Sequence, residues 1–335
     1  MALTSPQGAS FARILGVGGY RPSRIVTNAE ICERIDSSDE WIRERSGIES
    51  RRWAGPDESV IDMSCAAAGK AIAQAGISPE QVGAVLLATV THPLQTPSAA
   101  AAVADRLGLG GAGAGAAATD LSAACAGFCY GVSLAHDMVR GGSAEYVLVI
   151  GCEKLSDFTD SYDRSTAFIF GDGAGAVVIG PSDEPAIGPT IWGSNGAEYD
   201  AITQRASWLD VRDHQVDFPT LTMQGQKVFR WAVWQMAPVA QQALDAAGVR
   251  AEDLGAFIPH QANMRITDAM IKALKLPAHV PVARDIRETG NTSAASVPLA
   301  MERMLESGEV KSGDTALLIG FGAGLVYAAQ VVVLP

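Results

Sequence analysis

AGISPEQVGAV at residues 75–85 returns in altered form as AGVRAEDLGAF at residues 247–257. Each copy follows an alanine-rich helical pattern, AAAGKAIAQ or VAQQALDA, and runs into a short apolar segment that leads to a histidine, His92 or His260. Because self-similarity of this kind indicates a duplicated supersecondary unit, the repeat predicts two similar halves.

The two halves match again further along the chain. YVLVIG at 146–151 parallels ALLIG at 316–320, each after a helix-like segment that ends near a glycine. Helix-like segments that alternate with short β-branched runs predict an α/β fold with buried sheets. We therefore expect one half at 11–180 and the other at 181–335, related by pseudo-symmetry, with a site where equivalent loops meet.

Composition and charge narrow the functional class. With 25 Lys and Arg against 37 Asp and Glu, the net charge of −12 opposes nucleic-acid binding, because phosphate contacts need a basic surface. The uncharged stretch from Ala316 to Pro335 contains several glycines and predicts two buried strands joined by a turn rather than a membrane span. Five cysteines without C-x-x-C spacing predict neither a disulfide framework nor a zinc or redox site, and they indicate a reducing cytoplasm.

One of these cysteines lies where a strand is expected to turn into a helix. DLSAACAGF at 120–128 precedes the helical pattern CYGVSLAHDMVR, and small neighbours leave room around Cys125. Free amides and the dipole at a helix N-terminus favour a thiolate, so we expect a lowered pKa for this thiol. The alternative for an isolated cysteine is a buried structural residue.

Three further motifs follow predicted strands or turns. His260 lies in IPHQAN, Asn291 lies in TGNTSAAS, and GFGAG occupies 320–324. Each has a structural alternative: His260 could be a hydrogen-bonded core residue, Asn291 could belong to a Gly-Asn turn, and residues 320–324 could form a tight glycine turn. The functional interpretation of the glycine loop is that its amides approach a reacting oxygen.

A basic stripe is the last candidate feature. A helix predicted over 264–276 would carry Arg265, Lys272 and Lys275 broadly on one face. In an acidic protein this stripe is a candidate for receiving phosphates, although a solvated helix face is the alternative. Four arginines of an earlier segment would join it: Arg43, Arg45, Arg51 and Arg52.

Taken together, the motifs resemble β-ketoacyl-[acyl-carrier-protein] synthase III, the condensing enzyme that starts type II fatty-acid synthesis. The resemblance runs from about Ile14 to the C-terminus and implies the thiolase fold, five layers αβαβα with two duplicated halves, as a cytoplasmic homodimer. The motifs that carry it appear in order: SSDEWIRERSGIESRR at 37–52, AACAGF at 123–128, DRSTAFIFGDGAGA at 163–176, PHQAN at 259–263 and GNTSAASVP at 290–298.

The resemblance implies a catalytic set of Cys125 as nucleophile with His260 and Asn291, and an oxyanion hole made by the amides of Cys125 and Ala323. Elongating synthases use two histidines, and thiolases place a second cysteine in the C-terminal glycine loop, which has none here. The implied substrates are an acyl-CoA and malonyl-acyl carrier protein. The reaction needs no metal, nucleotide or redox cofactor.

The resemblance also implies substrate contacts. Ser165 departs from a glycine common in the family, and Thr96 resembles the end of an acyl pocket reached across the dimer, where a small residue suggests room beyond acetyl. The implied CoA contacts are Trp41, Arg45, Arg164, Phe229 and Asn263. The implied carrier-protein contacts are Gln261, Ala262, Asn263, Met264, Arg265, Arg230 and Lys272.

Three rival interpretations remain open. A homologous priming synthase of a polyketide or other secondary pathway would have the same catalytic motifs. A papain-like cysteine hydrolase also runs Cys, His, Asn along its chain, but Cys125 lacks the C-G-[SA]-C-[WY] setting. A non-catalytic partner subunit typically lacks the nucleophile that is present here.

Overall fold

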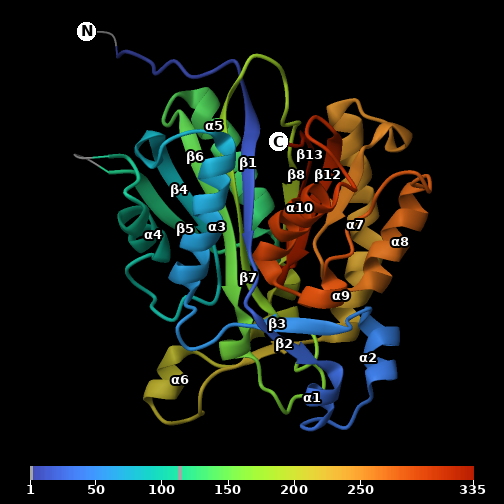
Figure 1. The fold of residues 1–335 in the computed structure, drawn as a ribbon. Helices are drawn as coiled ribbons and strands as arrows, with labels where there is room; N and C mark the ends of the chain where they lie inside the picture. Colours follow the sequence, from blue (N-terminus) through green and yellow to red (C-terminus); the bar gives the residue numbers. More distant parts are fainter. Residues whose placement is uncertain (1–2, 112–114) are drawn as a thin grey trace.

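The computed structural model describes residues 3–111 and 115–335, which form two mixed sheets flanked by helices (Figure 1). The first sheet has the strand order β1-β7-β6-β4-β5. Its β4, β5 and β6 run parallel, whereas β7 is antiparallel to both β6 and β1. The strands are β1 (Phe11–Tyr20), β4 (Val82–Ala88), β5 (Ala117–Leu121), β6 (Tyr146–Lys154) and β7 (Asp172–Ser182).

The second sheet repeats this order as β8-β13-β12-β11. Its β11 and β12 are parallel, and β13 is antiparallel to β12 and β8. In place of β5, the second half has a single bridge, in which Val282 pairs in parallel with Phe257 of β11. The strands are β8 (Ile191–Gly193), β11 (Ala256–Pro259), β12 (Thr315–Gly322) and β13 (Val326–Val333).

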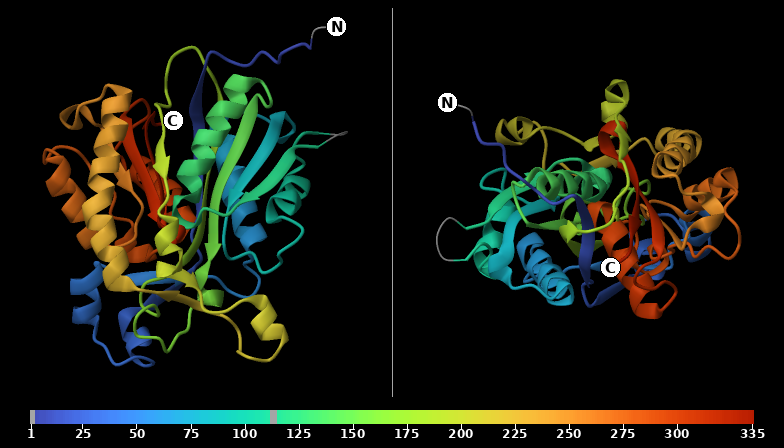
Figure 2. Two further views of the ribbon diagram at one scale, coloured as in Figure 1. Left: turned by 180° about the vertical axis from the view of Figure 1, so that it is seen from behind. Right: turned by 90° about the horizontal axis from the view of Figure 1, so that it is seen from above.

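Helices complete five layers (Figure 2). The outer face of the first sheet packs on α3 and α4, the outer face of the second packs on α7 and α8, and α5 and α10 lie between the sheets. The helices are α3 (Val60–Ala75), α4 (Ala99–Leu107), α5 (Gly127–Gly141), α7 (Gly225–Ala247), α8 (Met264–Leu274), α9 (Ile286–Thr289) and α10 (Ser296–Ser307).

The apolar runs of the central strands explain this sandwich. Along β6, Val147 packs against the central helices and Leu148 against the outer ones. Along β12, Leu318 points to the centre and Leu317 to the outside. Since side chains alternate along a strand, strands buried on both faces must be apolar at successive positions.

Both copies of the repeated AG dipeptide end a helix. Gly76 follows α3 and Gly248 follows α7, and each has a left-handed backbone with φ of 68°. Glycine adopts this conformation without a steric penalty, so the repeat marks equivalent helix ends in the two halves.

Elements outside the duplicated core gather at one end of the molecule, at the bottom of Figure 1. They are β2 (Arg24–Thr27), α1 (Asn28–Cys32), α2 (Asp39–Ser46), β3 (Ser50–Trp53) and α6 (Trp208–Arg212). A further two-stranded sheet joins β9 (Ile202–Gln204) to β10 (Leu221–Met223). The short 3₁₀ turns are η1 (Pro79–Gln81), η2 (Ala124–Ala126), η3 (Leu155–Phe158), η4 (Gly196–Ala201), η5 (Ala251–Asp253), η6 (Ser293–Ala295) and η7 (Ala323–Leu325).

The predicted five-layered αβαβα fold with two pseudo-symmetric halves is confirmed. The uncharged C-terminal stretch forms antiparallel β12 and β13 joined through η7, as predicted. Within the described residues, no helix is long and apolar enough to cross a membrane. The division between residues 180 and 181 stays a prediction, and β7 itself continues to Ser182.

Candidate active site

The two halves build the same turn in front of their central helices. In the first half η2 leads into α5, and in the second half η6 leads into α10. The first residue of each turn has a left-handed backbone, with φ of 44° at Ala124 and 48° at Ser293. Cys125 therefore occupies the position that Ala294 occupies in the second half, at a strand-to-helix turn as predicted.

Each turn packs against the end of a strand from the other half. A Cβ added to Gly322, at the end of β12, would lie 2.8 Å from Cys125 Sγ. A Cβ added to Gly151, near the end of β6, would lie 2.1 Å from the carbonyl oxygen of Ala294. Only glycine permits these approaches, so the glycines bring the loops of the two halves together.

A cavity of about 850 Å³ opens in front of Cys125. Cys125, His260 and Asn291 all border it, so the structure brings together the three residues predicted as catalytic. The other predicted site residues that line it are Trp41, Arg45, Arg164, Phe229, Arg230, Ala262, Asn263 and Arg265.

Cys125 is half-buried and borders the cavity. Burial is the largest cause that raises the pKa of its thiol to about 12; Ser293 acts in the opposite direction, and the negative charge of Glu153 adds to the effect of burial. The predicted lowering of this pKa by the helix end is therefore wrong for the resting site, in which burial dominates. The thiol needs a proton acceptor before it can attack.

His260 lies directly after β11 and is held from both sides. Its backbone N–H donates to the carbonyl of Ile319 at 2.7 Å, and its ring lies edge-on to Phe321. Burial lowers the pKa of the imidazole to about 3, so the ring is neutral near pH 7. Its Nδ1 lies 2.7 Å from the hydroxyl oxygen of Ser296, which also accepts the backbone N–H of Gln261. Because the Ser296 oxygen already accepts from Gln261, we assign its own proton to a hydrogen bond with Nδ1, which places the imidazole proton on Nε2 as a donor.

The amide of Asn291 is oriented by its own loop. Its Oδ1 accepts the backbone N–H of Ser293 at 2.8 Å, which leaves the Nδ2 hydrogens as donors. The backbone N–H donates to Ile169 at 2.9 Å and the carbonyl accepts from Gly171 at 3.0 Å. The neutral imidazole and this amide thus supply hydrogen-bond donors to one cavity, an arrangement that stabilises an oxyanion.

The outer part of the cavity is aromatic and cationic. The guanidinium of Arg164 lies 4.9 Å from the Trp41 ring centroid, and that of Arg45 lies 6.0 Å from it. Nearby, Arg265 lies 5.0 Å from the Phe229 centroid. Such a surface suits a flat heterocycle with attached phosphates.

Asn263 begins α8 and has partners at both ends of its amide. Its Oδ1 accepts the backbone N–H of Arg265 at 2.9 Å, and its Nδ2 donates to the carbonyl of Arg45 at 2.9 Å. One amide N–H and one lone pair remain for a ligand, so the predicted contact with the pantetheine arm stays a prediction.

Some predicted contacts lie away from the cavity lining. Lys272 is exposed on α8. Met264 packs against the end of α2: a Cβ added to Gly47 would lie 2.5 Å from the Cβ of Met264. Thr96 is exposed between β4 and α4, and Ala323 follows Gly322 in the turn against Cys125. Their predicted roles stay predictions.

The structure corrects two sequence-based assignments. Arg51 is fully buried and donates to Asn28 Oδ1 at 2.7 Å and the Phe168 carbonyl at 2.8 Å, so its predicted phosphate contact is wrong. Gln261 is also buried: its amide donates to the Pro259 carbonyl at 2.7 Å and accepts from the Ile286 N–H at 3.1 Å. This side chain cannot touch a docked carrier protein.

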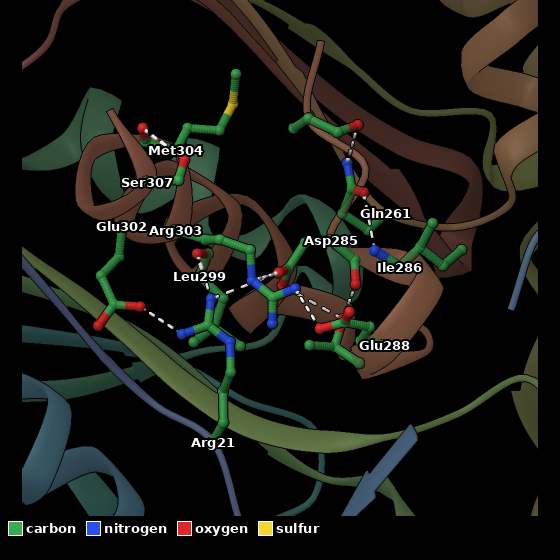
Figure 3. Close-up of polar contacts among 12 residues, drawn as sticks. Arg21, Gln261, Asp285, Ile286, Glu288, Leu299, Glu302, Arg303, Met304 and Ser307 are labelled. Atoms are coloured by element: carbon green, nitrogen blue, oxygen red, sulfur yellow. Dashed lines mark hydrogen bonds and ion pairs between the residues drawn. The ribbon is translucent and has the colours of Figure 1, made fainter. Parts of the chain in front are cut away.

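A cluster of ion pairs supports the loop that carries Asn291 (Figure 3). Asp285, at the start of α9, lies 2.6 Å from Arg303 of α10 and 3.5 Å from Arg21 after β1. Arg21 also pairs with Glu302. The cluster ties α9 and α10 to the first half of the chain, and α9 ends at Thr289, with Gly290 as its cap directly before Asn291.

Ser293, Ser296 and Glu153 were not among the predicted site residues, although both serines lie inside the GNTSAASVP motif. Nothing local in that motif indicates which hydroxyl meets His260 and which lies beside Cys125. In the part of the chain that the structure describes, no three His, Cys, Asp or Glu side chains are grouped to hold a metal ion.

Comparisons with known proteins agree with this geometry. Residues 119–196 match the family described as 3-Oxoacyl-[acyl-carrier-protein (ACP)] synthase III, and residues 244–334 match its C-terminal region. The chain is 66% identical over 330 residues to beta-ketoacyl-[acyl-carrier-protein] synthase III of Streptomyces glaucescens, with 98% of each chain covered.

Solved structures give the same picture. The priming beta-ketosynthase from the R1128 polyketide biosynthetic pathway is 48% identical, with a TM-score of 0.96 over 100% of this chain and 99% of that one. The 3-oxoacyl-(acyl carrier protein) synthase III of Pseudomonas aeruginosa PAO1 is 39% identical, with a TM-score of 0.88 over 97% and 98%.

Proposed function

Because the chain belongs to the 3-oxoacyl-[acyl-carrier-protein] synthase III family of condensing acyltransferases, we propose that it joins an acyl group from coenzyme A to a malonyl unit on acyl carrier protein. Cys125 is the nucleophile, and His260 and Asn291 act on the malonyl thioester. The observation that carries the proposal is the cavity in which these three side chains meet behind an aromatic and cationic mouth.

The first half-reaction loads the enzyme. Cys125 attacks the acyl-CoA thioester, and the amides of Cys125 and Ala323 stabilise the tetrahedral oxyanion. CoA leaves as the acyl-enzyme forms, so the kinetics are ping-pong. Trp41, Arg45 and Arg164 hold the nucleotide end of CoA, whose ring and phosphates match their chemistry.

The second half-reaction makes the carbon–carbon bond. The malonyl thioester loses carbon dioxide, and the Nε2–H of His260 and the Nδ2–H of Asn291 donate to its carbonyl oxygen as the enolate develops. The carbanion then attacks the acyl group on Cys125 and releases a 3-ketoacyl-carrier product. A neutral imidazole suits this role because it donates without needing an added proton.

The acidic carrier protein docks on the cationic surface beside the mouth. Arg230, Arg265 and Lys272 are exposed there, and opposite charges guide such encounters. Thr96 closes the acyl pocket of the partner in a homodimer. A cytoplasmic location is supported by the five cysteines, all of which are free.

Intact-protein mass spectrometry tests the proposal. We expect incubation with acetyl-, isobutyryl- or a longer acyl-CoA to add one acyl mass, and Cys125→Ala to abolish it. Cys65→Ala is the matched control because this half-buried thiol lies in α3, and it should label like the wild type. Labelling of Cys125→Ala, or no labelling of the wild type by any acyl-CoA or acyl-carrier donor, would overturn the proposal.

Priming of a polyketide or other secondary pathway is the second candidate, favoured by the 48% identity to the R1128 priming ketosynthase. Introducing the gene into bacteria depleted of their own starter synthase separates the two. Restored growth with new fatty acids supports the primary pathway. Failure to restore growth, together with efficient loading by longer acyl-CoAs, supports the secondary one.

A further inference from the structure

Helix α9, which leads to Asn291, has no capping side chain of its own. Asp285 occupies its N-cap position, but the backbone there is already helical, with φ of −60°, and the side chain makes no capping hydrogen bond. The Asp285 carboxylate instead pairs with Arg303 at 2.6 Å and lies 3.5 Å from Arg21. Because the first N–H groups of a helix have no partner within it, a buried helix start needs an acceptor from elsewhere.

Gln261 supplies that acceptor from a distant part of the chain. Its Oε1 accepts the N–H of Ile286, the first residue of α9, at 3.1 Å, although the two residues are 25 positions apart (Figure 3). Its Nε2 donates to the Pro259 carbonyl at 2.7 Å and to the Ala283 carbonyl at 3.4 Å. Both amide hydrogens of this buried side chain are therefore used, and the amide is fixed in one orientation.

The same residue also holds the loop of His260. The two are neighbours in the chain, and the Pro259 carbonyl that the amide binds lies directly before the histidine. The Gln261 backbone N–H donates to Ser296 Oγ at 3.3 Å, and that oxygen lies 2.7 Å from His260 Nδ1. Gln261 thus fixes this loop with its main chain and its side chain.

A short path connects the capped N–H to Asn291. Helix α9 consists of Ile286–Thr289, and the N–H of Gly290 closes it on the Ile286 carbonyl at 3.0 Å. Asn291 follows directly. One turn of helix therefore links the Gln261 amide to the second donor of the site.

The first half of the chain has no such amide. In the sequence repeat His92 corresponds to His260, so Pro93 takes the place of Gln261, and Pro93 is exposed. A proline side chain has neither a donor nor an acceptor. The first half carries the proposed nucleophile and neither enolate donor, so the bridging amide is found in the half where the two donors lie.

We propose that Gln261 is a positioning residue that holds His260 and Asn291 at the separation at which both donate to one developing enolate oxygen. This inference rests on the proposed function and assigns Gln261 to the second half-reaction. Two donors stabilise one oxygen only while both stay within hydrogen-bond distance of it, so a small displacement of either weakens the effect. The hydrogen bonds of Gln261 in the described chain do not include Cys125, on which acylation depends.

The variant Gln261→Met tests this bridge. Methionine has a similar length and fills the buried site, but it has no amide to cap α9 or to bind the Pro259 carbonyl. Single-turnover acylation is followed by quenched mass spectrometry, and decarboxylation of malonyl-carrier protein is measured on enzyme that has already been acylated. We expect kcat for decarboxylation to fall about tenfold, KM for the malonyl-carrier substrate to stay within about twofold, and acylation to be unchanged.

Two further variants keep the result specific. Gln330→Met is the matched control: Gln330 is a fully buried glutamine of β13 that donates to the Cys129 carbonyl at 3.0 Å, and its loss should not slow decarboxylation relative to acylation. Gln261→Glu is the conservative variant, because burial favours its protonated form, which donates to Pro259 and still accepts from Ile286. It should keep decarboxylation within about threefold of the wild-type rate.

Wild-type decarboxylation in Gln261→Met would overturn the assignment. So would equal loss of both half-reactions, which marks a purely structural role. If Gln261→Met does not fold, as judged by circular dichroism, Gln261→Asn carries the test, because its amide is one carbon too short to bind both Pro259 and Ile286.

Crystal structures of the wild type and Gln261→Met give a readout that needs no activity. We expect the distance between His260 Nε2 and Asn291 Nδ2 to differ between them by about 0.5 Å or more, the tolerance of a catalytic arrangement. An unchanged distance would contradict the inference. A wild type that neither acylates nor decarboxylates would instead count against the proposed function, so the two failures are distinguishable.

Discussion

The turns η2 and η6 have the same backbone conformation, but different side chains surround them. In η2 the turn carries Cys125 and meets Gly322, which leaves the thiol room to face the cavity. In η6 the equivalent residue is Ala294, and the strand end beside it carries Glu153 rather than glycine. A duplicated fold thus presents two equivalent turns with different side chains: the nucleophile lies in one, and a buried acid lies beside the other.

The supports of the two turns also differ. The second half fixes the Asn291 loop with paired charges, in which Asp285 lies between Arg21 and Arg303. No Lys or Arg side chain pairs with Glu153 in the chain as described. Paired buried charges hold geometry, whereas an unpaired buried acid changes its protonation near neutral pH.

The largest expected effect is on the free energy of unfolding, and it comes from Glu153, the unpaired buried acid. The pKa of Glu153 is raised from 4.5 to about 7, so between these values the folded protein holds a proton that the unfolded chain has lost. Its contribution is full below about pH 4.5 and falls by about 3 kcal/mol as pH rises through 7. We expect the free energy of unfolding of Glu153→Gln, measured in urea, to lack this decline.

His260 supplies the internal control for that experiment. Its pKa is depressed to about 3, so its contribution is lost as pH falls below about 6.5, in the opposite direction. The comparison is therefore the difference between wild type and Glu153→Gln at each pH. A difference that stays flat from pH 4.5 to 7 would contradict the assigned protonation state.

The next largest expected effect concerns Gly322, the glycine at the end of β12 that contacts Cys125. Gly322→Ala adds a Cβ 2.8 Å from Cys125 Sγ, and the displaced thiol should acylate about 100-fold more slowly, or about 2.7 kcal/mol. The measurement is single-turnover acylation. Gly69→Ala in α3 is the matched control because an added Cβ there meets nothing within 4 Å; wild-type acylation in Gly322→Ala would refute the steric argument.

A smaller effect tests the first residue of each central helix. Ser296 starts α10 and meets His260 Nδ1, whereas its equivalent in α5, Gly127, has no side chain. We expect Ser296→Ala to slow malonyl decarboxylation about tenfold, or about 1.4 kcal/mol, because the tautomer with a proton on Nε2 loses its support. Acylation of Cys125 should change little. Recovery in Ser296→Thr is the expected check, and equal slowing of both half-reactions would count against the assignment.

The fold and the three catalytic residues could be predicted from the sequence because the motifs that indicate them are local. The repeated AG marks a helix end, and Cys125, His260 and Asn291 each lie in a short motif after a predicted element. The supporting contacts were not predictable in this way, because their partners are distant. Ser296 is 36 residues from His260, and the Thr91 hydroxyl reaches Glu153 across 62 residues.

Burial explains the wrong predictions. Sequence shows that Arg51 is charged and that Cys125 precedes a helix, but it does not show that Arg51 is fully buried or that the Cys125 thiol is desolvated. For Arg51, burial turned a predicted phosphate contact into a set of internal hydrogen bonds. For Cys125, loss of water outweighed the helix end and reversed the direction of the pKa shift.

The smallest expected effect tests whether the two turns store the same backbone strain. Ala124 and Ser293 have φ of 44° and 48°, where a Cβ costs about 1 kcal/mol relative to glycine. Ala124→Gly should therefore raise the free energy of unfolding by up to about 1 kcal/mol, and Ser293→Gly should gain the same relief. If the two variants gain different amounts in the free energy of unfolding, the two turns have the same backbone conformation but not the same strain.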